Sequence, residues 1–146
     1  MKILNDVKIN YVWAHFLLGA SLYVGLELLW RGYTHFSMFL AGGTAYVMLI
    51  YIRRRFVVSA GWFVIAACIG AVVITAVELV FGIIFNIILG MNVWDYSQFR
   101  MNFVGQISLT YSLLWIFVAM FAFAVDFGVC RAYTVLDAVR RHKIDV

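Results

Sequence analysis

The segment Asn92-Val-Trp-Asp-Tyr-Ser-Gln-Phe-Arg-Met-Asn102 is the most polar run between two long apolar parts of the chain. Residues 57–89 before it are almost wholly apolar, and residues 104–126 after it are apolar as well. Each apolar part is long enough to cross a lipid bilayer, which takes about 20 such residues. We therefore expect the polar segment to lie at one face of a membrane.

The composition of the whole chain is typical of a membrane protein. Of its 146 residues, 66% are hydrophobic and 12% are charged, and the mean hydropathy is +0.99. Soluble domains carry about 25% charged residues. We predict an all-α, polytopic membrane helix bundle that forms a single integral domain over residues 1–146. The four expected spans cover about 9–30, 36–52, 57–89 and 104–126.

The lengths of these segments leave some features open. The third apolar run has more residues than one crossing needs, so it tilts, projects beyond the membrane, or breaks near Gly82 or Gly90. The tail, residues 127–146, is a C-terminal amphipathic helix on the membrane surface or an extension of the last span. Similar residues around Glu27 and Glu78 are compatible with two repeated helical hairpins.

Basic residues near the span ends predict the orientation of the chain. Nine of them fall on one side of the four-span arrangement: Lys2, Lys8, Arg53, Arg54, Arg55, Arg131, Arg140, Arg141 and Lys143. Only Arg31 and Arg100 fall on the other side. Because basic residues collect on the cytoplasmic side, we expect both termini in the cytoplasm of a multi-pass protein of a cell membrane, such as a bacterial inner membrane. The polar segment is then extracytoplasmic.

Two acidic side chains lie inside apolar runs, where an ionised carboxylate costs at least a few kcal/mol. Glu27 precedes Arg31 by four residues, a spacing that allows an ion pair on a helix. Glu78 has no basic residue nearby in sequence, so it needs a partner from another segment, a proton, or contact with water. Its candidate partners are Arg31, His35 and Arg100. Both acids are expected in the outer part of their spans, on the side of Asp95.

Small and polar residues recur at helical spacing on three of the expected spans. They are Ser37, Ala41, Thr44 and Ala45; Ala67, Ala71, Thr75, Glu78, Gly82 and Asn86; and Gly105, Ser108, Ser112, Trp115, Ala119, Ala122 and Asp126. Such stripes let helices approach closely and form hydrogen bonds, so we expect them to face the interior of the bundle. An alternative interpretation is that Glu78 and Asn86 only join helices.

No cofactor or metal is expected. His15 and His35 are predicted near opposite membrane faces, and the sequence has no zinc spacing, Ser-His-Asp arrangement or phosphate-binding glycine loop. The basic clusters have no accompanying nucleic-acid-binding motif, so nucleic acid is not an expected partner.

The segment Val93–Trp115 resembles the signature of the Putative ABC-transporter type IV family, which is W-D-Y-S, two residues, P, one residue, N, two residues, G-Q-I and then S-L-L-W. The matching residues are Trp94, Asp95, Tyr96, Ser97, Asn102, Gly105, Gln106, Ile107 and Trp115, and Glu78 matches an acidic residue usual in the preceding span. Arg100 stands where the family has proline. The resemblance implies a membrane protein of four or more spans. Because this chain has no nucleotide-binding loop, an ATP-driven role would require a separate ATPase.

The motif also has a purely structural interpretation. Asp95 and Ser97 are suited to a turn, Asn102 to the N-cap of the last span, and Gly105 to close packing. Trp94 and Tyr96 are suited to the membrane interface. This interpretation does not explain why two acids inside the spans are directed toward the same region.

We therefore predict a small membrane protein that transports or binds a small solute, ion or lipid through an extracytoplasmic polar cluster. The candidate ligand-binding or ion-coupling residues are Glu27, Arg31, His35, Glu78, Asn86, Asp95, Tyr96, Arg100, Asn102 and Gln106. The first alternative is an accessory subunit of a larger membrane complex or a homo-oligomer. The second is a membrane enzyme acting on a lipid-linked substrate, for which the sequence shows no nucleophile or metal set.

Overall fold

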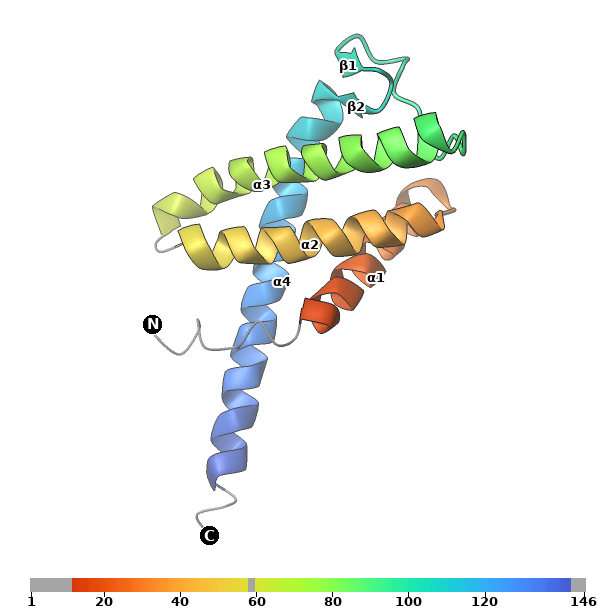
Figure 1. Ribbon diagram of the computed structural model, residues 1–146. Helices are drawn as coiled ribbons and strands as arrows, with labels where there is room; N and C mark the ends of the chain where they lie inside the picture. Colours follow the sequence, from red (N-terminus) through yellow and green to blue (C-terminus); the bar gives the residue numbers. More distant parts are fainter. Residues whose placement is uncertain (1–11, 58–59, 143–146) are drawn as a thin grey trace.

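The computed structural model describes residues 12–57 and 60–142. Helices account for most of this part of the chain, as predicted (Figure 1). They are α1 (Val12–Arg31), α2 (Phe36–Phe56), α3 (Ala60–Phe81), the π-helix η3 (Gly82–Ile88) and α4 (Leu109–His142). A short antiparallel hairpin, β1 (Asn102–Phe103) and β2 (Ile107–Ser108), precedes α4. The four α-helices, α3 together with η3, are each long and apolar enough to cross a membrane.

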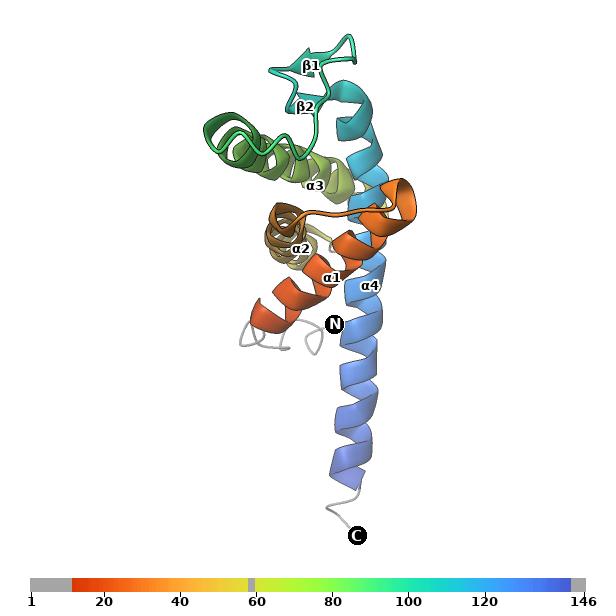
Figure 2. The same cartoon turned by 90° about the vertical axis from the view of Figure 1, so that its right-hand side faces the viewer.

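The helices pack around α2. α1 lies along one side of α2 and α3 along another, while α4 crosses α2 and α3 steeply. Figure 2 shows α4 running past one side of the other three helices and continuing well beyond them toward the C-terminus. The hairpin of β1 and β2 lies at the end of the molecule near η3, where it joins α3 to α4 (Figure 1).

Two helix boundaries differ from the approximate limits of the expected spans. The second helix continues past residue 52 to Phe56, so the three arginines belong to its last turn. The last helix begins at Leu109 and not near residue 104, because residues 102–108 form the hairpin. Val104 and Gly105 in this hairpin have φ angles of 53° and 68°, which lie in the left-handed region and cannot continue a right-handed helix.

The structure decides between the alternatives that the sequence left open for the long third apolar run and for the tail. The regular α-helix ends at Phe81, and Gly82 begins one turn of π-helix. The tail continues α4 without a break to His142, so it is an extension of the last span. Lys2, Lys8 and Lys143, on which the predicted orientation partly depends, lie outside the described residues.

The predicted stripes face the interior. On α3 and η3 the buried members are Ala67, Ala71, Glu78, Gly82 and Asn86, and near and on α4 they are Gly105, Ser108, Trp115, Ala119, Ala122 and Asp126. The hydroxyl of Thr75 on α3 donates a 3.1 Å hydrogen bond to the hydroxyl of Ser112 on α4. Small side chains on both helices allow this close approach.

Candidate functional site

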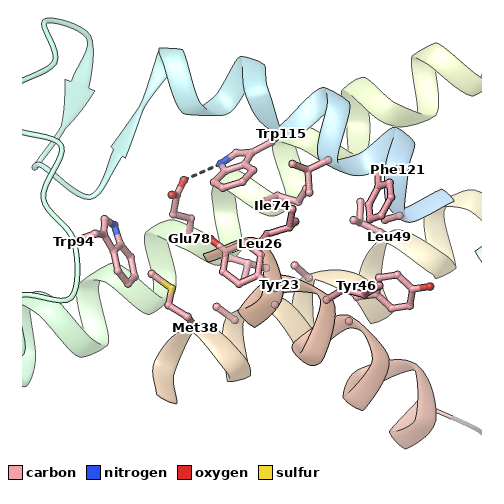
Figure 3. A pocket seen from close by; sticks show the side chains of 18 residues that line it. Tyr23, Leu26, Met38, Tyr46, Leu49, Ile74, Glu78, Trp94, Trp115 and Phe121 are labelled. Carbon is pink, nitrogen blue, oxygen red and sulfur yellow. Dashed lines mark hydrogen bonds between the residues drawn. The ribbon is translucent and has the colours of Figure 1, made fainter. Parts of the chain in front are cut away.

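Glu78 is buried near the end of α3, with 9% of the residue exposed. One of its oxygens, Oε1, accepts a 2.8 Å hydrogen bond from the Tyr96 hydroxyl, and Oε2 accepts a 3.0 Å bond from Nε1 of Trp115 (Figure 3). Burial and the nearby Glu78 carboxylate raise the pKa of Tyr96, so its hydroxyl keeps its proton and acts as the donor. Both partners of Glu78 are neutral side chains.

The basic residues that the sequence suggested as partners of Glu78 are bonded elsewhere or exposed. Arg31 forms the expected ion pair with Glu27, and its Nη1 also donates a 3.2 Å bond to the Val93 carbonyl. His35 caps α2, where its Nδ1 accepts a 3.2 Å bond from the backbone N–H of Ser37. Arg100 is exposed. Among the described residues, none of these cations neutralises Glu78.

Asn86 and Gln106 fasten the loop before α4 to η3. The Asn86 amide nitrogen donates to the Trp94 carbonyl at 2.9 Å and to Oε1 of Gln106 at 2.7 Å, and its oxygen accepts from the Val93 N–H at 2.7 Å. A Cβ at Gly82 would lie 2.6 Å from Oε1 of Gln106, so this contact requires glycine. These bonds place Trp94 and Tyr96 beside Glu78. Asn86 and Gln106 therefore position the site.

Asn102 organises the loop and does not cap the last helix, contrary to the prediction. Its Oδ1 accepts a 3.0 Å bond from the Gly105 N–H, and its amide nitrogen donates to the Phe99 carbonyl at 2.5 Å. Because α4 begins later than expected, Ser108 takes the capping position, and its hydroxyl accepts from the Tyr111 N–H at 3.4 Å.

Asp95 closes a turn at the surface. Its Oδ1 accepts a bond from the Ser97 N–H and its Oδ2 from the Ser97 hydroxyl, both at 2.8 Å. The backbone bond, with the hydroxyl second, lowers the pKa of Asp95 below its ordinary value of 3.8. The carboxylate is exposed, whereas that of Glu78 is buried, so Asp95 supports the loop and Glu78 lies deeper.

We expect this turn to depend on pH. A carboxyl with a lowered pKa in the folded state contributes stability above its ordinary pKa, and the contribution is lost as the pH falls through the lowered value. The amide chemical shift of Ser97, followed by NMR from pH 6 downward, should change only at a lower pH than expected for an ordinary aspartate, whose pKa is 3.8. In Asp95→Asn this change should disappear. An unchanged titration in Asp95→Asn would assign it to another acid.

A cavity of about 70 Å³ lies beside Glu78, between α1, α2, α3 and α4. Its walls are almost entirely apolar and include the aromatic side chains of Tyr23, Trp94 and Trp115 near Glu78 and of Tyr46 and Phe121 farther away (Figure 3). Glu78 is the only lining residue with a formal charge among those described. The sequence analysis assigned Trp94 to the interface and Trp115 to the interior stripe, but it did not predict a cavity.

A second charged cluster lies at the opposite end of the helices. Asp126 on α4 is fully buried and forms ion pairs with Arg53 and Arg54 on α2, the latter at 3.3 Å. Arg54 also lies 3.2 Å from Nε2 of His15 on α1. The sequence analysis interpreted the arginines only as signals of orientation. In the sequence, this cluster was indicated only by Asp126, an acid in a stripe of small residues that was predicted to face the interior.

Chemically, the described residues do not form a metal centre, since they include no group of three or more His, Cys, Asp or Glu that could hold a metal ion. Residues 12–141 match the model of the family described as Putative ABC-transporter type IV. No curated protein and no solved structure matches the chain. The matched region includes all four α-helices, Glu78 and the loop before α4.

Proposed function

Since the chain belongs to the Putative ABC-transporter type IV family, we propose that this multi-pass membrane protein binds a small solute in the cavity beside Glu78 as a step in transport. The observation that carries the proposal is a buried carboxylate, bonded only to neutral donors, at the side of an apolar cavity. An acid in apolar surroundings is favourable only when a proton or a cation neutralises it. A bound solute can supply either one.

The other buried or half-buried acids of the described chain provide an internal contrast. Asp126 is paired with two arginines and Glu27 with Arg31. Both acids are therefore neutralised within the protein, as expected for groups that join helices. Glu78 has no such cation among the residues that the structure describes, and an amide could also join Tyr96 and Trp115. This contrast favours a ligand-binding role for Glu78 over a purely structural one.

The proposed ligand site is smaller than the cluster predicted from the sequence. Glu78 and Tyr96 remain as candidate ligand-binding or ion-coupling residues, together with the aromatic walls of the cavity. Arg31, His35, Asn86, Asp95, Asn102 and Gln106 make bonds that support helices and the loop. We propose that they position the site and do not touch the solute.

The proposal includes the predicted orientation, with both termini in the cytoplasm and the loop before α4 outside. The Glu78 end of the cavity then faces the extracytoplasmic side, and the cluster around Asp126 the cytoplasmic side. The sequence has no nucleotide-binding loop. If transport is driven by ATP, a separate ATPase must associate with this chain or with an oligomer of it.

Labelling with diisopropylcarbodiimide, a small uncharged reagent that modifies carboxyl groups, tests whether a molecule can reach Glu78. The full chain is reconstituted in phosphatidylcholine nanodiscs, and adducts are located by mass spectrometry. We expect an adduct on Glu78 that is absent in Glu78→Gln and retained in Glu27→Gln. Ala41→Leu and Ala45→Leu, made separately, fill the cavity and should suppress labelling.

Two results would contradict the proposed function. One is a folded protein whose Glu78 is not modified at any reagent concentration that modifies exposed carboxylates such as Asp95. The other is a Glu78 adduct that forms equally fast in both cavity-filling variants. Circular dichroism of each variant shows whether its helices are retained, so a misfolded variant can be set aside in favour of the other.

A further inference from the structure

We infer that the solute is an amphipathic amine. Its ammonium group binds the Glu78 carboxylate among Tyr23, Trp94 and Trp115, and its apolar chain occupies the cavity and leaves it between α1 and α4. This inference rests on the proposed function and names the class of molecule that the same site binds. It follows from four features of the cavity: its charge, its aromatic walls, its size and its opening.

The charge of the cavity selects a cation. Glu78 is the only formally charged residue among the described residues that line it. Its two oxygens accept one hydrogen bond each from Tyr96 and Trp115, whereas an ionised carboxylate can accept about four. An ammonium group supplies up to three donors and a compensating charge. A fatty acid carboxylate would instead be repelled by Glu78.

Aromatic rings surround the carboxylate. Figure 3 shows Trp94 and Trp115 on opposite sides of Glu78, with Tyr23 of α1 below Trp115 in this view. The rings of Tyr23 and Trp115 have centroids 6.4 Å apart and are tilted by 53°. The faces of tryptophan and tyrosine rings attract ammonium groups, most strongly where water is excluded. A purely apolar ligand would need neither these rings nor the acid.

The size of the cavity limits what it encloses. Its volume of about 70 Å³ is less than half that of an engineered apolar cavity of about 150 Å³ that binds benzene. It therefore holds a primary ammonium group and the first carbons of a chain, and not a bulky quaternary head. A longer chain must extend out of the cavity.

The cavity opens toward the surface of α1 and α4. Two of its lining residues, Leu26 on α1 and Phe121 on α4, are 40% and 51% exposed. The exposure of these two lining residues opens the cavity to the surface at α1 and α4. Because these surfaces are apolar and belong to membrane-spanning helices, the opening faces lipid chains. An amphipathic molecule can enter from the bilayer by this route.

Competition among three molecules with the same eight-carbon chain tests the inference. Octylamine is protonated at neutral pH, octanol is uncharged, and octanoate is negatively charged. Each is added to the full chain in phosphatidylcholine nanodiscs, and binding is followed by tryptophan fluorescence. We expect octylamine to bind saturably, octanol to bind at least about 10-fold more weakly, and octanoate not to bind.

Variants separate the charge from the aromatic contacts. Glu78→Gln should bind octylamine and octanol with equal affinity, as judged by fluorescence, whereas the matched variant Glu27→Gln should keep the wild-type preference. Tyr23→Leu, which retains Glu78, should weaken octylamine binding more than octanol binding. If Glu78→Gln does not fold, Tyr23→Leu alone decides whether the aromatic wall recognises the ammonium group.

The failures of the two proposals are distinguishable. Equal binding of octylamine and octanol to the wild-type protein overturns the amine inference and leaves a cavity that binds apolar solutes. Binding of octanoate in preference to octylamine overturns it as well. If Glu78 is not labelled in the absence of any ligand, the proposed function itself fails.

Discussion

Replacing Asp126 with alanine is expected to lower the free energy of unfolding by about 3 to 5 kcal/mol, the usual cost of leaving a buried charge without its partner. Asp126 is fully buried and pairs with Arg53 and Arg54, which are themselves buried or nearly so. Its removal leaves the buried Arg53 guanidinium between α2 and α4 without the carboxylate that pairs with it. Denaturation of the reconstituted protein with increasing mole fractions of a harsh detergent, followed by circular dichroism, measures the change.

A double variant distinguishes a lost partner from lost packing. Asp126→Leu combined with Arg53→Met replaces the pair with apolar side chains of similar size, and it should recover much of the stability. Glu27→Gln provides a milder control, because its partner Arg31 is close to the helix end and only partly buried. Equal stability of Asp126→Ala and the wild-type protein would show that solvent reaches the two arginines and that the cluster holds no helices together.

Alanine substitutions at two glycines of α1 are expected to change the free energy of unfolding in opposite directions. A Cβ at Gly19 on α1 would lie 2.1 Å from the Cβ of Tyr46 on α2, whereas nothing lies within 4 Å of a Cβ at Gly25. Gly19→Ala therefore forces α1 away from α2 and should cost about 1 to 3 kcal/mol. Gly25→Ala adds a good helix former in open space and should stabilise the helix by about 0.5 to 1 kcal/mol.

The same denaturation measurement checks both substitutions. The comparison needs no further control, because the two variants make the same chemical change in the same helix. Equal effects of Gly19→Ala and Gly25→Ala, in either direction, would mean that α1 does not pack on α2 through Gly19. Such a result would also remove the wall of the cavity that α1 contributes.

The membrane-spanning fold and most of the interior could be predicted because they depend on local patterns. Apolar length identifies a span, and the three- to four-residue spacing of small and polar residues identifies its inner face. The start of α4 could not be predicted in this way. Apolar residues after Asn102 resemble a helix, but a φ of 53° at Val104 and the bonds of Asn102 make a hairpin instead.

The candidate site was predicted only in part for a related reason. The sequence marked Glu78 as an acid without a local partner, and Tyr96 as part of a motif. Tyr96 and Trp115, which both bond to Glu78, belong to two segments that are 18 and 37 residues from it in the chain. Nothing local to any of them indicated that the partners would be neutral or that a cavity would lie beside them.

The amino-acid sequence by itself determined that this is a membrane protein, which helices cross the membrane, which faces of α3 and α4 are interior, and the family. These properties follow from composition, periodicity and the motif, which are all read along the chain. The tertiary structure alone decided how each acid is neutralised: Glu27 by Arg31, Asp126 by two arginines, and Glu78 by no cation among the described residues. The physical reason is that charge neutralisation in an apolar medium depends on distances between helices, and only the packing of α1, α2, α3 and α4 sets those distances.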